Sequence, residues 1–195
     1  MKKYYSTTKP YFKRKRLRLG FRLFKAILRL FFPKNEVIYR CEKPSDDEPM
    51  FMVSNHTKIY APLAALLCPK KKIRVWSNYY FLYFKEIGNH LFNKVLIDRK
   101  PKWLLYPLGA LLIPLIVWIF RSIEPIPVYH KTKKVQITFD KSIETMEEGV
   151  DQMIFPERTE NPVNKYIYEF NTGFPYVAKQ YYEQTGKRMK YYPVY

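Results

Sequence analysis

Short apolar runs rich in β-branched and aromatic residues alternate with longer stretches of helical periodicity along most of the chain. The runs predict strands at 37–40, 51–54, 73–76, 126–129, 153–155 and 191–194. Between them, apolar residues at helical spacing predict helices at 61–67, at about 79–96 and at 137–148, the last stopped by Gly149. Strands that alternate with helices indicate an α/β protein, so we expect a central mixed β-sheet flanked by helices.

An amphipathic helical pattern precedes these elements, at residues 17–31, and ends before Pro33. Leucine and phenylalanine cover most of its surface, and one face carries a basic stripe made of Arg18, Arg22, Lys25 and Arg29. Such a pattern is typical of a helix that lies in a membrane interface. The alternative is an ordinary surface helix that packs its apolar face on the domain.

A second apolar stretch, at residues 103–120, contains 18 residues without a charge. Its length is near the lower limit for a transmembrane helix, about 17–25 residues. Pro107, Gly109 and Pro114 argue against a straight span. We therefore expect a buried or interfacial helical segment, with a re-entrant path as one form of it, and keep a membrane span as the alternative.

Composition and charge limit the classes of partner that the chain is expected to bind. The chain has 195 residues and a formal net charge of +18, from 35 Lys and Arg against 17 Asp and Glu. Residues 1–35 hold 12 of these cations and no acid. We therefore divide the chain into a basic amphipathic membrane-association segment, 1–35, and a folded domain, 36–195. The excess of cations indicates an anionic partner, and its concentration on one amphipathic helix favours anionic membrane lipids over nucleic acid.

The sequence lacks the patterns of several common sites. Its three histidines and two cysteines lie far apart, without the spacing of metal ligands, so we expect no metal. It also has no glycine-rich phosphate loop.

Two predicted strands end in groups that can carry chemistry. His56 follows the strand at 51–54, and Glu157 follows the strand at 153–155. Sites of α/β proteins form at the carboxyl ends of strands, so these two ends are expected to face one pocket. For His56 alone, a structural hydrogen-bonding role is the alternative.

Four short blocks then occur in an order that resembles a known family. The blocks are Ser54-Asn55-His56, Ile126-Pro127-Val128, Phe155-Pro156-Glu157-x-Thr159 and Tyr192-Pro193-Val194. Their types and order are similar to the four motifs of the glycerolipid acyltransferases of the lysophosphatidic acid acyltransferase type. Members of that family often carry a basic membrane-binding helix before the first motif. The chain resembles a divergent member.

The resemblance implies a reaction and a set of roles. His56 would be the general base that takes the proton from an acceptor hydroxyl as it attacks an acyl thioester. Glu157 would help form the acceptor pocket, which Asn55, Phe155, Pro156 and Thr159 would shape. The implied partners are an acyl donor thioester, acyl-CoA or acyl carrier protein, used as co-substrate without a cofactor, and a lysophospholipid-type acceptor. The implied location is the cytoplasmic face of a membrane, as a peripheral or monotopic protein.

Departures from the family motifs fall on important positions. Ala61 stands where the family has the aspartate that pairs with its histidine, and loss of such a carboxylate costs a serine protease roughly 10⁴-fold in rate. Replacement partners for His56 are Tyr60, Glu157, Asp98 or a backbone carbonyl.

The third motif has Arg158 at its glycine position and Glu160 at its arginine position, and Tyr129 and His130 follow the second motif in place of an arginine. Arg158 or His130 is a candidate to bind phosphate instead. Lysines at 58 and 70–72 are further candidates, although a charge run is usually a solvated face.

Three functions follow from these observations. The leading one is an O-acyltransferase of phospholipid synthesis. The second is a non-enzyme of the same fold, which keeps a lipid pocket without turnover, as Ala61 and Glu160 suggest. The third is nucleic-acid binding, which the aromatic and basic composition allows but no recognition motif supports. The chain ends at Tyr195, inside the fourth motif and with no following helix or strand, so a domain truncated at its C-terminus is one expectation.

Overall fold

The computed structural model describes residues 15–32, 38, 40, 49–55, 60–67, 72–130, 134–157 and 169–194. For residues 15–18, 60 and 61 it describes the backbone only. Several residues named above therefore lie outside the described residues: His56, Lys58, Lys70, Lys71, Arg158, Thr159 and Glu160.

A five-stranded sheet forms the centre of the molecule. Its strands are β1 (Phe51–Ser54), β2 (Ile73–Asn78), β3 (Ile126–Val128), β4 (Asp151–Ile154) and β5 (Tyr191–Val194), in the order β3-β2-β4-β1-β5. Every pairing between them is parallel, with Val53 opposite Ile154 and Ser54 opposite Val194. The predicted α/β class with a central sheet flanked by helices is thus confirmed, but the prediction of a mixed sheet was wrong. Each strand connects to the next through helix, and such crossovers produce parallel pairs.

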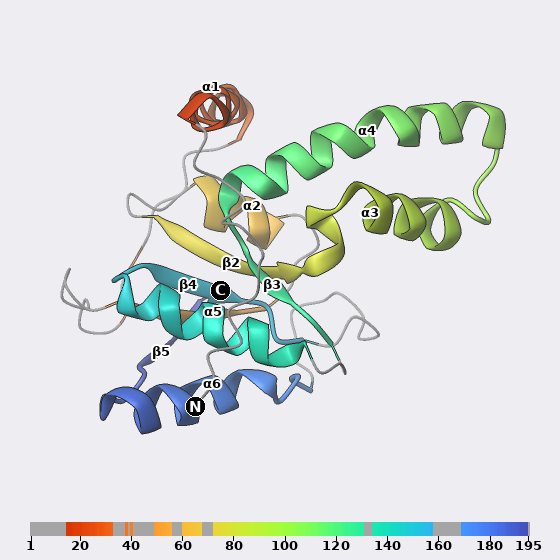
Figure 1. Ribbon diagram of the computed structural model, residues 1–195. Coiled ribbons are helices and arrows are strands. Elements are labelled where there is room, and N and C mark those ends of the chain that lie inside the picture. Colours follow the sequence, from red (N-terminus) through yellow and green to blue (C-terminus); the bar gives the residue numbers. More distant parts are fainter. Residues whose placement is uncertain are drawn as a thin grey trace.

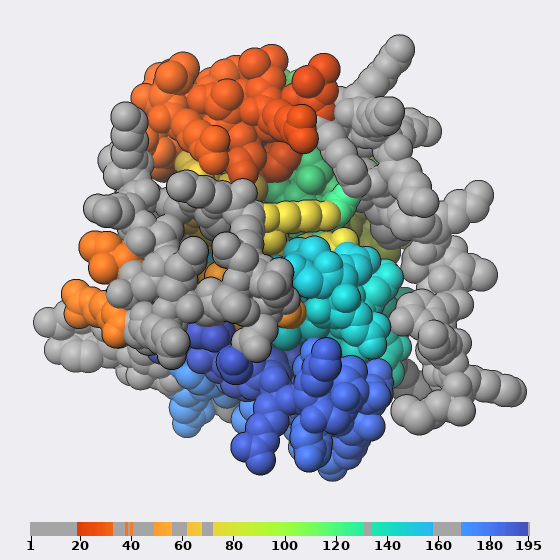
Figure 2. Space-filling model, turned by 90° about the vertical axis from the view of Figure 1, so that its left-hand side faces the viewer, coloured from red at the N-terminus to blue at the C-terminus, as the bar shows by residue number. Residues whose placement is uncertain are grey.

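Helices cover both faces of the sheet (Figure 1). They are α1 (Lys15–Phe31), α2 (Tyr60–Leu67), η1 (Tyr79–Leu82), α3 (Phe84–His90), η2 (Leu91–Val95), α4 (Lys102–Ile123), α5 (Val135–Glu147) and α6 (Gly173–Thr185). Figure 1 shows α1, α2 and α4 on one side of the sheet and α5 and α6 on the other. In the space-filling view α1 forms the surface at one pole, with α6 at the opposite pole (Figure 2).

The alternation of side chains along the strands supplies a separate core to each helical layer. Phe51 and Ile154 pack with α5 and α6, in a buried cluster completed by Phe139, Ile143, Met146, Val177 and Tyr181. Met52 and Met153 face the other side and pack against Ala65 of α2. This is why 51–54 and 153–154 read as continuous apolar runs in the sequence.

Gln152 is a fully buried polar residue at the centre of the sheet. Its Oε1 accepts hydrogen bonds from the Trp76 indole nitrogen at 3.1 Å and from the Ser142 hydroxyl at 2.5 Å. Its Nε2 donates to the Ser142 carbonyl at 2.6 Å. The side chain therefore joins β2, β4 and α5 with its polar atoms satisfied, as a buried amide requires.

We expect Gln152→Leu to lower the free energy of unfolding by about 2–4 kcal/mol, since each buried group left without a partner costs roughly 1–3 kcal/mol. Urea unfolding of the full-length chain in detergent measures this. Gln180→Leu is the matched control, because Gln180 bonds Gln136 at 3.0 Å in a half-buried pair where water can replace the lost partner. Equal losses in the two variants would show that the buried network contributes nothing particular.

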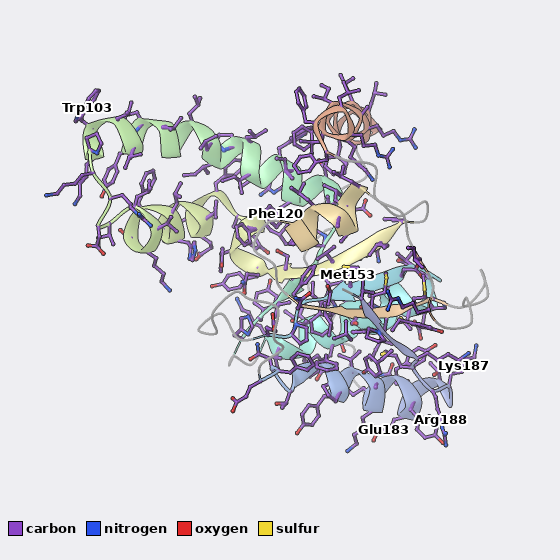
Figure 3. All side chains as sticks on the ribbon, turned by 180° about the vertical axis from the view of Figure 1, so that it is seen from behind. Trp103, Phe120, Met153, Glu183, Lys187 and Arg188 are labelled. Atoms are coloured by element: carbon purple, nitrogen blue, oxygen red, sulfur yellow. The ribbon has the colours of Figure 1, made fainter. Side chains whose placement is uncertain are left out.

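The α3–α4 hairpin leaves the sheet at the carboxyl end of β2 and projects past it (Figure 1). Trp103 marks its remote end and Phe120 its root (Figure 3). Pro107 and Pro114 lie inside α4, which nevertheless continues for 22 residues. In the described part of the chain, α4 is the one helix long and apolar enough to cross a membrane, and 11% of its most apolar stretch is buried. The prediction of a helix at 103–120 is confirmed, whereas burial within the protein was wrong.

Helix α1 packs on the domain through part of its apolar surface, as the second interpretation of its sequence expects, and the membrane-interface interpretation stays a prediction. Phe21 and Phe24 pack edge-on against Trp118 of α4, at centroid distances of 6.2 and 5.7 Å. Arg29 donates from Nη2 to the Leu67 carbonyl at 2.9 Å, which satisfies a carbonyl at the end of α2. Leu23 and Leu30, on the other side of the helix, remain exposed. The apolar surface of α1 is thus wider than its contact with the domain.

Several elements differ from the sequence predictions. Ile38 and Arg40, the described residues of 37–40, are not in a strand. Both edges of β1 are occupied by β4 and β5, so a neighbouring hairpin strand has no edge of β1 to pair with. The helix expected at 79–96 is divided into η1, α3 and η2, and α6 was not predicted. The stop at Gly149 is confirmed, since its φ of 68° ends α5.

Candidate functional site at the carboxyl edge of the sheet

The parallel sheet brings the carboxyl ends of its strands to one edge. Asn55 follows β1, Phe155 follows β4, and Tyr129 follows β3. Because β1 and β4 are paired, Asn55 and Phe155 leave neighbouring strands at the same edge. The first block thus begins at the end of β1, the third block follows β4, and the fourth block lies on β5. These three strands are adjacent, and the second block lies on β3.

The chain leaves β1 and β4 toward opposite faces of the sheet. After β1 it continues to α2, and after β4 it continues to α6, which lies in the other helical layer (Figure 1). Two adjacent strands with connections to opposite faces form a topological switch point, where open α/β sheets have their binding crevice. Asn55 and the segment Phe155–Pro156–Glu157 occupy this switch point. Sequence reasoning therefore selected two ends that the fold brings together.

The segment after β4 is held by residues that the sequence did not single out. The Pro156 carbonyl accepts hydrogen bonds from the Asn171 backbone nitrogen at 2.7 Å and from Asn171 Nδ2 at 3.1 Å. Glu157 forms an isolated antiparallel bridge with Phe170 and is half-buried. These contacts fix the backbone that carries Glu157. The sequence could have indicated Asn171, because it begins the turn-forming run Asn-Thr-Gly at the start of α6.

His130 is tied to the end of β2. Its Nε2 lies 3.0 Å from Asn78 Oδ1, and the neighbouring Tyr129 ring stacks on Tyr79 at 4.8 Å. The side chain of His130 is otherwise exposed. Asn78 is a polar residue at a strand's carboxyl end, so the criterion that selected His56 could also have selected Asn78.

A buried threonine sets the backbone that leads to His130. The Thr138 hydroxyl donates to the Pro127 carbonyl at 2.8 Å and accepts from the Tyr129 backbone nitrogen at 3.2 Å. It thereby fastens the end of β3 to α5. Within the apolar periodicity of the helix, the sequence gives no sign of this role.

The root of the hairpin contains a second stacked pair. The Tyr80 ring stacks on His90 at 4.4 Å. Burial raises the pKa of Tyr80, and a hydrogen bond with Asn78 opposes this shift. Burial and then the Lys94 charge lower the pKa of His90, so its imidazole is neutral at pH 7. Both groups are therefore uncharged, which suits a ring stack between the sheet edge and the hairpin.

Other residues proposed from the sequence lie away from this edge. Asp98 belongs to the loop between η2 and α4, at the end of the hairpin remote from the sheet (Figure 1). Lys72 precedes β2 at the amino edge and pairs with Glu124. Neither residue lies near Asn55 or Glu157. Asp98 is therefore excluded as the carboxylate partner of a histidine at this site. Lys72 is likewise excluded as a phosphate ligand there.

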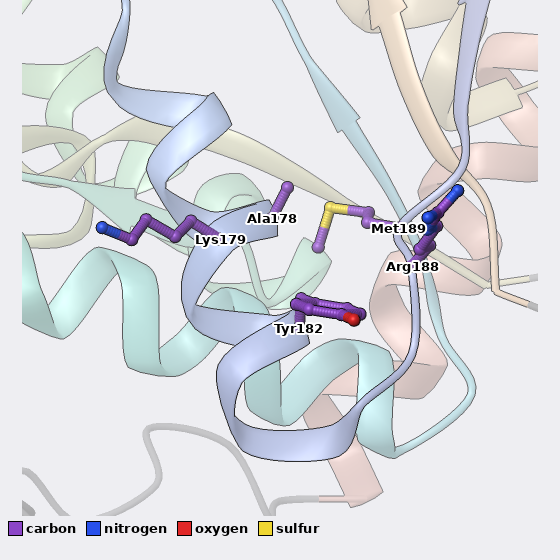
Figure 4. A pocket seen from close by; sticks show the side chains of 5 residues that line it. All are labelled: Ala178, Lys179, Tyr182, Arg188 and Met189. Atoms are coloured by element: carbon purple, nitrogen blue, oxygen red, sulfur yellow. The ribbon is translucent and has the colours of Figure 1, made fainter.

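A surface pocket of about 430 Å³ lies at the opposite edge (Figure 4). Ala178, Lys179 and Tyr182 of α6 line it with Arg188 and Met189, which precede the amino end of β5. Figure 3 shows the end of α6, marked by Glu183, Lys187 and Arg188, on the far side of the molecule from the hairpin. The pocket is separate from the candidate site.

The described residues contain no group of three or more His, Cys, Asp and Glu side chains placed to hold a metal ion. Comparison with known proteins identifies no relative: no protein-family model, no curated protein and no solved structure matches the chain.

Proposed function

We propose that the chain is a membrane-associated O-acyltransferase that transfers a fatty acyl group from acyl-CoA or acyl carrier protein to the hydroxyl of a lysophospholipid or glycerol-phosphate-type acceptor. The observation that carries this proposal is the direct pairing of β1 and β4 at the switch point of a parallel sheet. The strands that lead into two blocks end at this one place. These blocks are separated by about 100 residues in the sequence and resemble the first and third motifs of the family.

The proposed reaction is a direct transfer without a covalent enzyme intermediate. His56, the residue after Asn55 in the sequence, accepts the proton of the acceptor hydroxyl while that oxygen attacks the thioester carbonyl. The carbon–sulfur bond then breaks, and the departing thiolate takes the proton. Glu157 and Asn55 orient the acceptor, with Arg158 and Thr159 completing its pocket. His130 is the proposed phosphate contact, since it follows the second block at the same edge.

Attachment to the cytoplasmic face of a membrane fits this substrate, because lysophospholipids and their products reside in bilayers. The basic segment at residues 1–35 supplies the attraction to anionic lipids, with each cation near the surface contributing about 1 kcal/mol.

A second candidate function is lipid binding without turnover. It is favoured by Ala61, which occupies the position of the family's aspartate in a helix that follows β1. In this case the fold and the membrane attachment remain, and the proton relay is lost.

The test is an acyl-transfer assay on membranes that contain the full-length protein. We expect labelled acyl groups to pass from acyl-CoA or acyl carrier protein to lysophosphatidate, at a rate above that of host membranes without the protein. Acyl donors of several chain lengths should be tested, each with lysophosphatidate and, in a separate assay, with glycerol phosphate as the acceptor. Binding of lysophosphatidate without product from any donor would replace the enzyme with the lipid-binding alternative.

A further inference from the structure

The outer face of α4 is apolar and uncovered in the described part of the chain. Five leucines at helical spacing form this face together with Trp103 at its remote end: Leu104, Leu108, Leu111, Leu112 and Leu115. Leu111, at the middle of the helix, is 74% exposed. A contiguous apolar face on a helix of about 33 Å is larger than soluble proteins normally leave in water.

Helix α1 lies over the root of α4 and exposes a second apolar face. Trp118 lies two helical turns after Leu111, hence on the same side of α4, and it is the residue on which Phe21 and Phe24 pack. The other side of α1 exposes a further apolar row, made of Leu19, Leu23, Ile27 and Leu30. Both helices lie on one side of the sheet (Figures 1 and 3). Because α1 packs on the outer side of α4 through Phe21 and Phe24, its exposed row points away from the sheet, as the outer face of α4 does.

The opposite face of the hairpin is mainly polar. Four polar residues are exposed on α3 and η2, namely Lys85, Asn89, Asn93 and Lys94. Two apolar side chains, Phe84 and Val95, are about half-exposed beside them. η2 packs closely on α4 at Gly109, where an added Cβ would lie 3.2 Å from Leu91 Cδ2, and α3 meets α4 at Gly88, where an added Cβ would lie 3.6 Å from Ile113 Cδ1. The hairpin is thus one unit with an apolar and a polar side. If α4 crossed a bilayer, this unit would carry two lysines and two asparagines into hydrocarbon, which is costly.

Cations border the apolar face where lipid headgroups would lie. Arg99, Lys100 and Lys102 are exposed at the remote end of the hairpin, against one acid, Asp98. Arg22 is exposed on α1. An apolar face with cations at its margins is complementary to an anionic lipid surface.

We propose that α1 and the outer face of α4 form one docking surface for an anionic lipid bilayer, with α4 lying in the plane of the membrane and the α3 side in water. The hairpin extends past the carboxyl edge of the sheet (Figure 1), so the candidate site lies beside the bilayer surface. The docking surface does not depend on acyl transfer, and its tests require no turnover.

Flotation of the full-length protein with vesicles of phosphatidylethanolamine and phosphatidylglycerol tests the surface. We expect Leu111→Glu to weaken partitioning about 10- to 100-fold, because a leucine side chain that inserts into the bilayer is replaced by a carboxylate. Asn93→Glu adds the same charge on the polar side and should bind as the wild type does. Circular dichroism should show both variants folded, since both positions are exposed.

Two results would overturn the proposal. One is equal partitioning of the two variants in flotation. The other is a Leu111→Glu protein that binds vesicles as the wild type does but is a monomer where the wild type is an oligomer, because the face would then be a protein interface.

The orientation of α4 is tested by labelling single cysteines in the vesicle-bound protein with a membrane-impermeant maleimide. After Cys41 and Cys68 are replaced by serine, Arg99→Cys reports the remote end of the hairpin and Lys187→Cys reports the domain. A helix in the membrane plane leaves both thiols on the side of the added protein, so both should react at similar rates. Protection of the Arg99→Cys thiol until detergent is added would show a span instead.

Discussion

His56→Ala is expected to reduce acyl transfer by about 10²- to 10⁴-fold, the usual contribution of a general base. The acceptor hydroxyl is a weak nucleophile while it keeps its proton, and no other side chain that follows β1 or β4 in the first and third blocks is a base of similar pKa. Initial rates at saturating donor and acceptor, measured on membranes with equal amounts of protein, give this ratio. The loss should appear in kcat more than in KM, because the proton moves only during the chemical step.

His90→Phe is the matched control, since it removes a histidine outside the proposed site and keeps a ring to stack on Tyr80. Its rate should stay within a few-fold of the wild type. Ala61→Asp approaches the same relay from the other direction. If the carboxylate is what the chain lacks, this variant should gain activity, by up to roughly 10⁴-fold on the serine-protease comparison. Wild-type rates in His56→Ala would remove His56 from the mechanism.

The strands were predictable because each one contains a short apolar run. Phe51–Ser54 and Tyr191–Val194 have the expected bounds, and the others differ by one to three residues. Their direction was not predictable from the runs themselves, because buried parallel and mixed sheets share the same apolar patterns. α6 was missed because Val177 and Tyr181 are its only fully buried side chains, and polar and aromatic residues fill the rest of its surface.

The position of α4 relative to the rest of the protein was also not predictable from the sequence. Residues 103–120 are apolar on nearly every side, and a core helix and a lipid-facing helix have this composition in common. What distinguishes them is the partner: α3 and η2 cover one side of α4, with close contacts at Gly88 and Gly109, and α1 reaches only the end near Trp118. Those contacts join segments far apart in the chain, which periodicity does not encode.

For the candidate site, the rule that polar groups at strand ends gather at one edge selected His56 and Glu157. Glu157 lies at that edge, and His56 lies outside the described residues. Asn55 and His130, which were named from the family motifs, also follow strands at that edge. It could not supply the neighbours that hold them. Asn171 reaches the Pro156 carbonyl from the start of another helix, and Thr138 reaches the end of β3 from inside α5. Such partners follow from tertiary packing and have no fixed spacing in the sequence.

The largest loss of stability is expected for Phe51→Ala, about 3–5 kcal/mol. Phe51 is 0% exposed and begins β1, the strand between β4 and β5. Its ring packs edge-on against Trp76 at 6.0 Å and Tyr191 at 5.1 Å, so its removal leaves a cavity under α5 and α6. Partial burial of Tyr191 beside this ring also raises the pKa of Tyr191 to about 12.

Urea unfolding of the full-length protein in detergent, followed by near-ultraviolet circular dichroism, measures the loss caused by Phe51→Ala. Phe31→Ala is the matched control, because the same side chain is 79% exposed at the end of α1 and its loss should stay within about 0.5 kcal/mol. The four residues of β1 connect the Phe51 cluster to Asn55, so a cavity at the start of the strand should also loosen the site at its end. Acyl transfer should therefore be lost at lower urea in Phe51→Ala than in Phe31→Ala. Equal unfolding midpoints for the two variants would mean that β1 does not carry the core in this way.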